Sequence, residues 1–110
     1  MTPAGADGVL VYEVNLDVDA GIAGEYRAWL EAHVRGMLAL PGFASAHVFE
    51  VLEGAPGDGD LHLCVHYILR NAAALEAYLR DHAPRMRAEG VARFGDRFRA
   101  SRRVLRPTDT

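Results

Sequence analysis

The strongest strand signal in the chain is Leu61-His62-Leu63-Cys64-Val65-His66-Tyr67-Ile68-Leu69-Arg70. This segment is rich in β-branched, aromatic and aliphatic residues and contains neither Gly nor Pro. Successive side chains of a strand point to opposite faces, so one face is apolar throughout and the other is mixed. The apolar face carries Leu61, Leu63, Val65, Tyr67 and Leu69, and the mixed face carries His62, Cys64, His66 and Ile68. We predict a strand in the middle of a sheet, with helices covering its apolar face.

The segments on either side predict three more strands and two amphipathic helices. Strands are expected over residues 9–16, 43–52 and 98–105, although the alternation of 43–52 leaves open which of its faces meets the helices. The first helix has an apolar stripe of about five turns that includes the sole tryptophan, Trp29, and Asp17 or Asp19 can cap its N-terminus. Its stripe runs through Tyr26, Trp29, Leu30, His33, Val34, Met37 and Leu38, and it ends at Pro41-Gly42. The second helix is capped by Asn71, breaks at Pro84 and resumes as far as Gly95.

The resulting order, β-α-β-β-α-β, predicts an α+β fold of the ferredoxin-like type. This fold is a four-stranded antiparallel sheet with helices on one face, and its first and third strands form the central pair. A chain of 110 residues suits one such domain, expected over residues 9–106, with a flexible tail at 1–8 and a C-terminal tail at 107–110.

The face away from the helices predicts a partner. By strand parity it carries Val9, Val11, Cys64 and Ile68, and a two-layer domain has no element left to cover them. A second copy of the same sheet, related by two-fold symmetry, is the simplest cover. We therefore expect a homodimer through the open sheet face, which would form a dimeric α/β barrel.

Charge and composition argue against several classes of function. The net charge of −3 offers no general attraction to nucleic acid or anionic membranes. The basic C-terminal strand suggests RNA binding, but the aromatic residues Tyr12 and Tyr67 fall on the helix-covered face, so we expect no nucleic acid partner. Without a signal peptide or an apolar run of ~20 residues, a cytoplasmic protein with no membrane association is expected.

Several segments resemble a bacterial family of uncharacterised function in the dimeric α/β-barrel superfamily. The resemblance covers roughly residues 9–105 and is carried by Val11-Tyr12-Glu13-Val14-Asn15-Leu16, Glu25-Tyr26-Arg27-Ala28-Trp29-Leu30, Met37-Leu38-Ala39-Leu40-Pro41-Gly42-Phe43, Leu63-Cys64-Val65-His66-Tyr67, His82-Ala83-Pro84-Arg85-Met86-Arg87 and Arg93-Phe94-Gly95-Asp96-Arg97-Phe98 through Arg103-Val104-Leu105. It implies ferredoxin-like subunits that pair face to face. The wider superfamily contains antibiotic-biosynthesis-type and heme-degrading monooxygenases, stress-responsive proteins and ligand-binding regulators.

Polar residues on the open face predict a ligand site in the dimer cleft. If the first, third and last strands pair, they bring together a carboxylate, an imidazole and guanidinium groups, which suit an anionic or carbonyl-bearing ligand or proton transfer. The predicted ligand-binding residues are Glu13, Asn15, Cys64, His66, Arg99 and Arg103, with Ser101 beside them. His66 and Asn15 are the catalytic candidates. The alternative is that Glu13 pairs with Arg99 or Arg103 as part of a structural interface.

Three other interpretations of these residues are weaker. His62-x-Cys64-x-His66, with Glu13 from the neighbouring strand, has the residue types of a zinc site, but the outer two residues lie ~13 Å apart in a strand and one ion can take only two of the three. Asn15 and His82 match two residues that heme-degrading members carry, but the third strand lacks their tryptophan. Cys64 is interpreted as a buried structural thiol because the nucleophilic-cysteine signatures are absent. We expect no metal and no cofactor.

The sequence therefore predicts a small-ligand-binding or stress-related module. The alternative is a cofactor-independent monooxygenase or isomerase that acts on a small anionic or aromatic substrate in the dimer cleft. In that case His66 would act as the base, and Asn15 or an arginine would support an oxyanion.

Overall fold

The computed structural model describes residues 8–55 and 57–110. The elements are β1 (Leu10–Val18), η1 (Ala20–Ile22), α2 (Ala23–Leu38), β2 (Phe43–Glu50), β3 (Leu61–Leu69), α3 (Ala72–Asp81), α4 (Ala83–Phe94), η2 (Gly95–Arg97) and β4 (Phe98–Leu105). All strand pairs are antiparallel, and the sheet order is β2-β3-β1-β4. The predicted ferredoxin-like fold, with the first and third strands at the centre, is confirmed.

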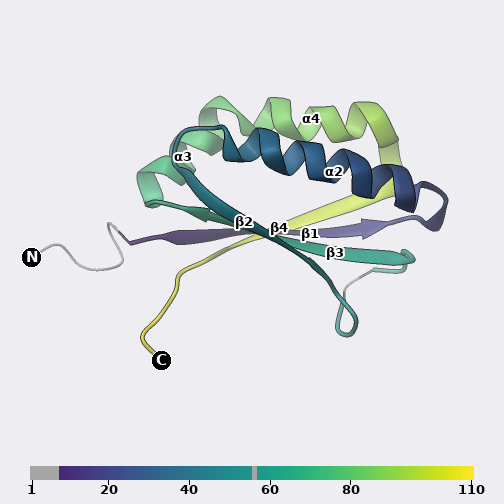
Figure 1. Cartoon of the computed structure of the whole chain (residues 1–110), viewed down its shortest axis with the longest axis horizontal. Coiled ribbons are helices and arrows are strands. Elements are labelled where there is room, and N and C mark those ends of the chain that lie inside the picture. Colours follow the sequence, from purple (N-terminus) through teal and green to yellow (C-terminus); the bar gives the residue numbers. More distant parts are fainter. Residues whose placement is uncertain (1–7, 56) are drawn as a thin grey trace, which may run out of the picture.

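The helices α2, α3 and α4 lie on one face of the sheet (Figure 1). The core fills the space between the two layers and contains a cluster of aromatic rings. Tyr26 contacts the rings of Trp29, Phe94 and Phe98 at centroid distances of 5.5, 5.1 and 5.2 Å. The apolar face of β3, from Leu61 to Leu69, is fully buried in this core. None of the described helices is long and apolar enough to cross a membrane.

The breaks between elements follow local backbone chemistry. Asn71 caps α3, because its side chain accepts a hydrogen bond from the backbone N–H of Ala74 at 2.9 Å. The predicted break at Pro84 is confirmed, since α3 ends at Asp81 and α4 begins at Ala83. Gly42, with φ of +87°, turns the chain from α2 into β2.

The predicted N-cap of the first helix is wrong. Asp17 lies inside β1, which starts at Leu10 and runs two residues further than expected. Its carboxylate accepts the backbone N–H of Gly59 at 2.7 Å instead. Asp19 precedes η1 without capping it and pairs with Arg99 at 2.9 Å. Helix α2 begins after η1 with no side-chain cap, because the intervening 3-10 turn supplies the change of direction.

The second strand ends at Glu50, two residues before the predicted end, and a register shift between Phe43 and Ser45 interrupts its alternation. This bulge turns Phe43 into the core, where it stacks edge-on against Tyr67 and Tyr78. The remaining residues show which face of this strand meets the helices. Ser45, His47 and Phe49 share the open face, and Ala46, Val48 and Glu50 share the helix face. The predicted tail over residues 1–8 lies, except for Gly8, outside the described residues.

Candidate functional site

The centre of the open face is a hydrogen-bonded network around the carboxylate of Glu13. In the register of the sheet, Glu13 lies between His66 on β3 and Arg103 on β4. Its Oε1 accepts hydrogen bonds from Arg103 Nε and Asn15 Nδ2, both at 2.7 Å, and its Oε2 lies 2.9 Å from His66 Nε2. Glu13 is 4% exposed, so these three bonds replace most of its hydration.

The network lowers the pKa of Glu13 to about 2. The hydrogen bond from Arg103 is the largest cause, burial opposes it, and the bonds from Asn15 and His66 add to the lowering. The carboxylate is therefore ionised throughout the physiological range. This geometry matches the interface alternative, in which Glu13 pairs with an arginine, and a ligand at Glu13 would have to replace one of its existing partners.

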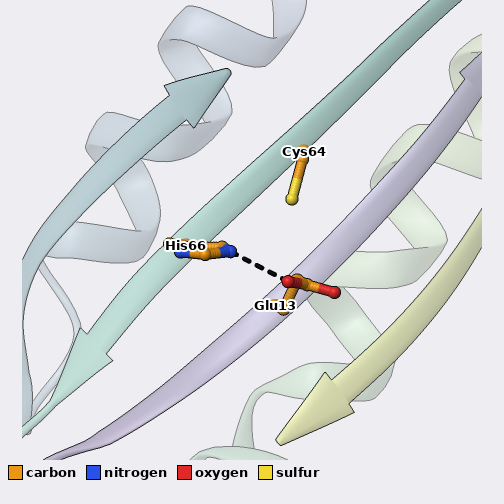
Figure 2. Close-up of side chains that lie close together, drawn as sticks. All are labelled: Glu13, Cys64 and His66. Carbon is orange, nitrogen blue, oxygen red and sulfur yellow. Dashed lines mark hydrogen bonds and ion pairs between the residues drawn. The ribbon is translucent and has the colours of Figure 1, made fainter. Parts of the chain in front are cut away.

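Cys64 and His66 extend from β3 toward Glu13 on β1 (Figure 2). One donor atom from each of the three side chains lies within 4.8 Å of the others. Cys64 is buried, and this burial, followed by the nearby Glu13 charge, raises the pKa of its thiol. A raised pKa disfavours the thiolate, which agrees with the prediction that Cys64 is not a nucleophile.

Arg99, which we expected near Glu13, lies elsewhere. Its register partner on β1 is Asp17, and its guanidinium pairs with Asp17 and Asp19 at 3.2 and 2.9 Å. Asp17 Oδ1 also lies 3.4 Å from Nδ1 of His62. With Asn15 and Ser101, these residues line a hollow of about 580 Å³ at the β2–β3 loop. The predicted ligand-binding set thus divides between the Glu13 network and this hollow.

A second cavity, of about 320 Å³, lies on the other side of the sheet, under the helices. We call it the helix-side cavity. Six aromatic residues line it together with aliphatic side chains, and these six are Tyr12, Tyr26, Trp29, Tyr67, Tyr78 and Phe98. Arg87 and Arg102 also line it, and Arg87 Nη2 donates to Tyr12 Oη at 2.9 Å. Aromatic walls with a few polar groups are typical of small-molecule pockets.

His33 adds an unusual polar group to this cavity. Its ring stacks on Trp29 at a centroid distance of 4.6 Å, and burial lowers its pKa, which favours the neutral imidazole. Within the part of the chain that the structure describes, its buried Nδ1 has no hydrogen-bond partner, and Glu89 Oε2 lies 4.0 Å from it. Glu89 does not line the helix-side cavity, so a water between the two groups would satisfy Nδ1 without a ligand in the cavity.

This cavity was not predicted from the sequence, because its residues look like ordinary core. Gly90 stands in the interior of α4, where glycine is unfavourable. A Cβ at Gly90 would lie 3.1 Å from both Phe98 and Trp29, so glycine lets these two rings of the cavity wall pack closely against α4.

The fold and the arrangement of its layers define a ferredoxin-like α+β protein. The chain belongs to the family described as a domain of unknown function, DUF4286, whose model matches residues 9–108. This confirms the resemblance to a family of uncharacterised function. No curated protein matches the chain.

Solved structures with the same fold are distant in sequence. A mutant of SnoaB, a cofactor-independent oxygenase from Streptomyces nogalater, is 15% identical with a TM-score of 0.66, covering 96% of this chain and 97% of SnoaB. Rv0793 from Mycobacterium tuberculosis is 20% identical with a TM-score of 0.67, covering 94% and 98%. A conserved protein from Methanosarcina mazei Go1 is 12% identical with a TM-score of 0.69, covering 93% and 95%. At these identities the likeness establishes the fold alone.

Proposed function

We propose that this protein is a homodimer that binds a small aromatic molecule in the helix-side cavity. The observation that carries the proposal is a cavity of about 320 Å³ with six aromatic side chains in its lining and a hydrogen-bonded Tyr12–Arg87 pair at its wall. A tightly packed core would not leave this space.

The polar groups indicate the ligand's chemistry. Arg87 and Arg102 supply positive charge, and the hydroxyl of Tyr12 can accept or donate a hydrogen bond. The aromatic walls favour a flat ring. A small aromatic carboxylate or phenol satisfies both, with its ring between the layers and its oxygen toward Arg87.

A ring probe of this class tests the binding. We use 2-naphthoate, which joins two fused rings to a carboxylate, and follow the fluorescence of Trp29, the sole tryptophan, which lines the cavity. Saturable quenching at one probe per chain is expected. Tyr12→Phe, which removes only the hydroxyl, and Gly90→Ala, which narrows the cavity, should each weaken binding several-fold. Ser101→Ala, in the open-face hollow, is the matched control and should bind normally. Equal affinity in all three variants would refute binding in the helix-side cavity.

The proposal of a homodimer depends on apolar residues that are exposed on the open face. Val9 is 43% exposed, and Phe49, whose ring lies 5.3 Å from that of His66, is 49% exposed. Val11 and Ile68 pair across β1 and β3 on the same face. No helix of residues 8–55 or 57–110 covers this face (Figure 1), so a second sheet is the natural partner.

Light scattering tests the dimer, which should have about twice the chain mass of 12.0 kDa. Ile68→Asp should shift the mass toward the monomer, because it would bury a charge without a partner in the interface. A stably folded monomer at micromolar concentration would refute the dimer. The cytoplasmic location and the ligand role of Glu13, Asn15 and Arg99 stay predictions.

A second candidate is a cofactor-independent oxygenase. It is favoured by the fold shared with SnoaB and by the hydrogen bond from His66 to the buried Glu13, which is the arrangement that orients a histidine as a base. Oxygen uptake with a dihydroxynaphthalene, compared with the uncatalysed rate, tests it. Loss of turnover in His66→Phe would identify His66 as the base. Loss of turnover in His33→Phe alone would place the reaction in the helix-side cavity. No oxygen uptake above background excludes oxygenation of this substrate class.

A further inference from the structure

We propose that Glu13, Cys64 and His66 form a binding site for a zinc-type divalent ion on the open face of the sheet. This inference goes beyond the proposed function, which places an organic ligand on the opposite face. It also departs from the expectation of no metal, because the structure brings Glu13, Cys64 and His66 together and places His62 beside Asp17 instead.

The strand register explains how three ligands converge. Cys64 and His66 are separated by two positions on β3, so both side chains point to the open face. Glu13 is the direct cross-strand partner of His66 on β1, and Cys64 is its diagonal neighbour. Figure 2 shows the side chains of the three residues pointing toward the space between the two central strands. Both strands are central in the sheet, so the site stands on rigid elements.

The donor set suits zinc chemically. Sulfur, imidazole nitrogen and carboxylate oxygen are its three usual protein ligands. Bond lengths of about 2.0–2.3 Å in a tetrahedral site imply donor separations of about 3.4–3.7 Å. The present separations are 2.9 Å between His66 Nε2 and Glu13 Oε2 and at most 4.8 Å for the pairs that include the sulfur. Small side-chain rotations that lengthen the His66–Glu13 separation and shorten the separations from the sulfur would admit the ion.

The other groups around Glu13 are placed to support such a site. Arg103 and Asn15 hold Oε1, which fixes the carboxylate and leaves Oε2 as the donor. Ligating carboxylates in metal sites are usually held by outer hydrogen bonds of this kind. On binding, the Cys64 thiol gives up its proton to solvent, so the ion meets a thiolate and a carboxylate, while Arg103 stays on the other oxygen of that carboxylate. His66 Nε2 exchanges its hydrogen bond to Glu13 for the metal, with the ring proton on Nδ1.

His62 does not belong to the site. Its Nδ1 lies 3.4 Å from Asp17, and it lines the hollow at the β2–β3 loop. Among the described residues the cluster contains three ligating side chains, which leaves the fourth position of a tetrahedral ion to water or another ligand. His66 is 31% exposed at its side chain, so an ion can reach the site in the single chain.

Titration of the reduced, metal-free protein with Co²⁺ tests the proposal, because a cobalt–thiolate bond has a near-ultraviolet charge-transfer band. One Co²⁺ per chain with this band, displaced by Zn²⁺, is expected. Cys64→Ser should abolish the band, and His66→Gln should weaken binding at least tenfold. His62→Gln, a matched change on the same strand, should bind like the wild type. Near-ultraviolet circular dichroism identifies variants that have lost their fold.

A wild-type protein without the band overturns the proposal. A band that survives unchanged in a folded His66→Gln variant also overturns it, since His66 would then not be a ligand of the ion. If Cys64→Ser fails to fold, the melting temperature of the wild type still tests the proposal. Zn²⁺ should raise this temperature, and a chelator should reverse the rise. The binding of 2-naphthoate is measured separately, in chelator, so failure of the metal site and failure of the proposed function are distinguishable.

Discussion

The ionised carboxylate of Glu13 makes the stability of this protein depend on pH in a calculable way. Glu13 has a pKa of about 2 in the folded chain, against 4.5 as the ordinary value. Because the folded pKa is the lower one, this group stabilises the fold above pH 4.5 and loses that contribution as the pH falls toward 2. This difference in pKa contributes about 3 kcal/mol to the free energy of unfolding at neutral pH, and about 2 kcal/mol of that contribution is lost at pH 3. Glu13 is 4% exposed, so little of this is lost to solvent screening.

The variant Glu13→Gln isolates this term, because glutamine has the same shape and no titration in this range. Urea unfolding of both proteins at pH 7 and pH 3, in chelator and at one protein concentration, gives the free energies. We expect the variant to be about 2–3 kcal/mol less stable at pH 7 and the gap to narrow by about 2 kcal/mol at pH 3. Glu31→Gln removes a carboxylate from an exposed pair with Arg35 and should change stability by less than about 1 kcal/mol at both pH values. If wild type and Glu13→Gln differ in stability by the same amount at pH 3 and pH 7, the assigned role of the Arg103–Glu13 pair is refuted.

Three further changes test the fold that positions the cavity and the network. Trp29→Ala should lower the free energy of unfolding by about 2–4 kcal/mol, because the indole packs against Tyr26, His33 and Phe94; a urea midpoint like that of the wild type would contradict this packing. Asn71→Ala should cost about 1 kcal/mol in the same assay through loss of the α3 cap, and no loss would show that the cap is dispensable. Gly42→Ala should lower the free energy of unfolding by about 2 kcal/mol or more, because φ is +87° and the new Cβ would collide with the Cβ of Ala74. Gly24→Ala, in open space on α2, should leave the free energy of unfolding unchanged or raise it.

The alternation of β3 and the order of elements were enough to predict the fold and the pairing of Glu13 with its neighbours. Once β1, β3 and β4 are adjacent, Glu13, His66 and Arg103 must share a face, and their contacts follow from side-chain length. Arg99 could not be placed in the same way, because its distance from Glu13 depends on register, and the register sets it opposite Asp17.

The remaining features depend on packing between elements that are distant in the sequence. The bulge before Ser45 has no strong local signal, so the face occupied by Phe43 was unpredictable from alternation. The helix-side cavity is lined by residues of the sheet and the helices, and a stripe of aromatic residues in the sequence looks the same whether it fills such a space or lines it.

A crystal structure of the protein grown with 2-naphthoate tests the proposed ligand site most directly. The structure predicts the naphthalene ring in the helix-side cavity, near Trp29 and Tyr78, with its carboxylate within hydrogen-bond distance of Arg87 or Tyr12. Density for the probe only in the open-face hollow beside Arg99, with the helix-side cavity empty or collapsed, would contradict it.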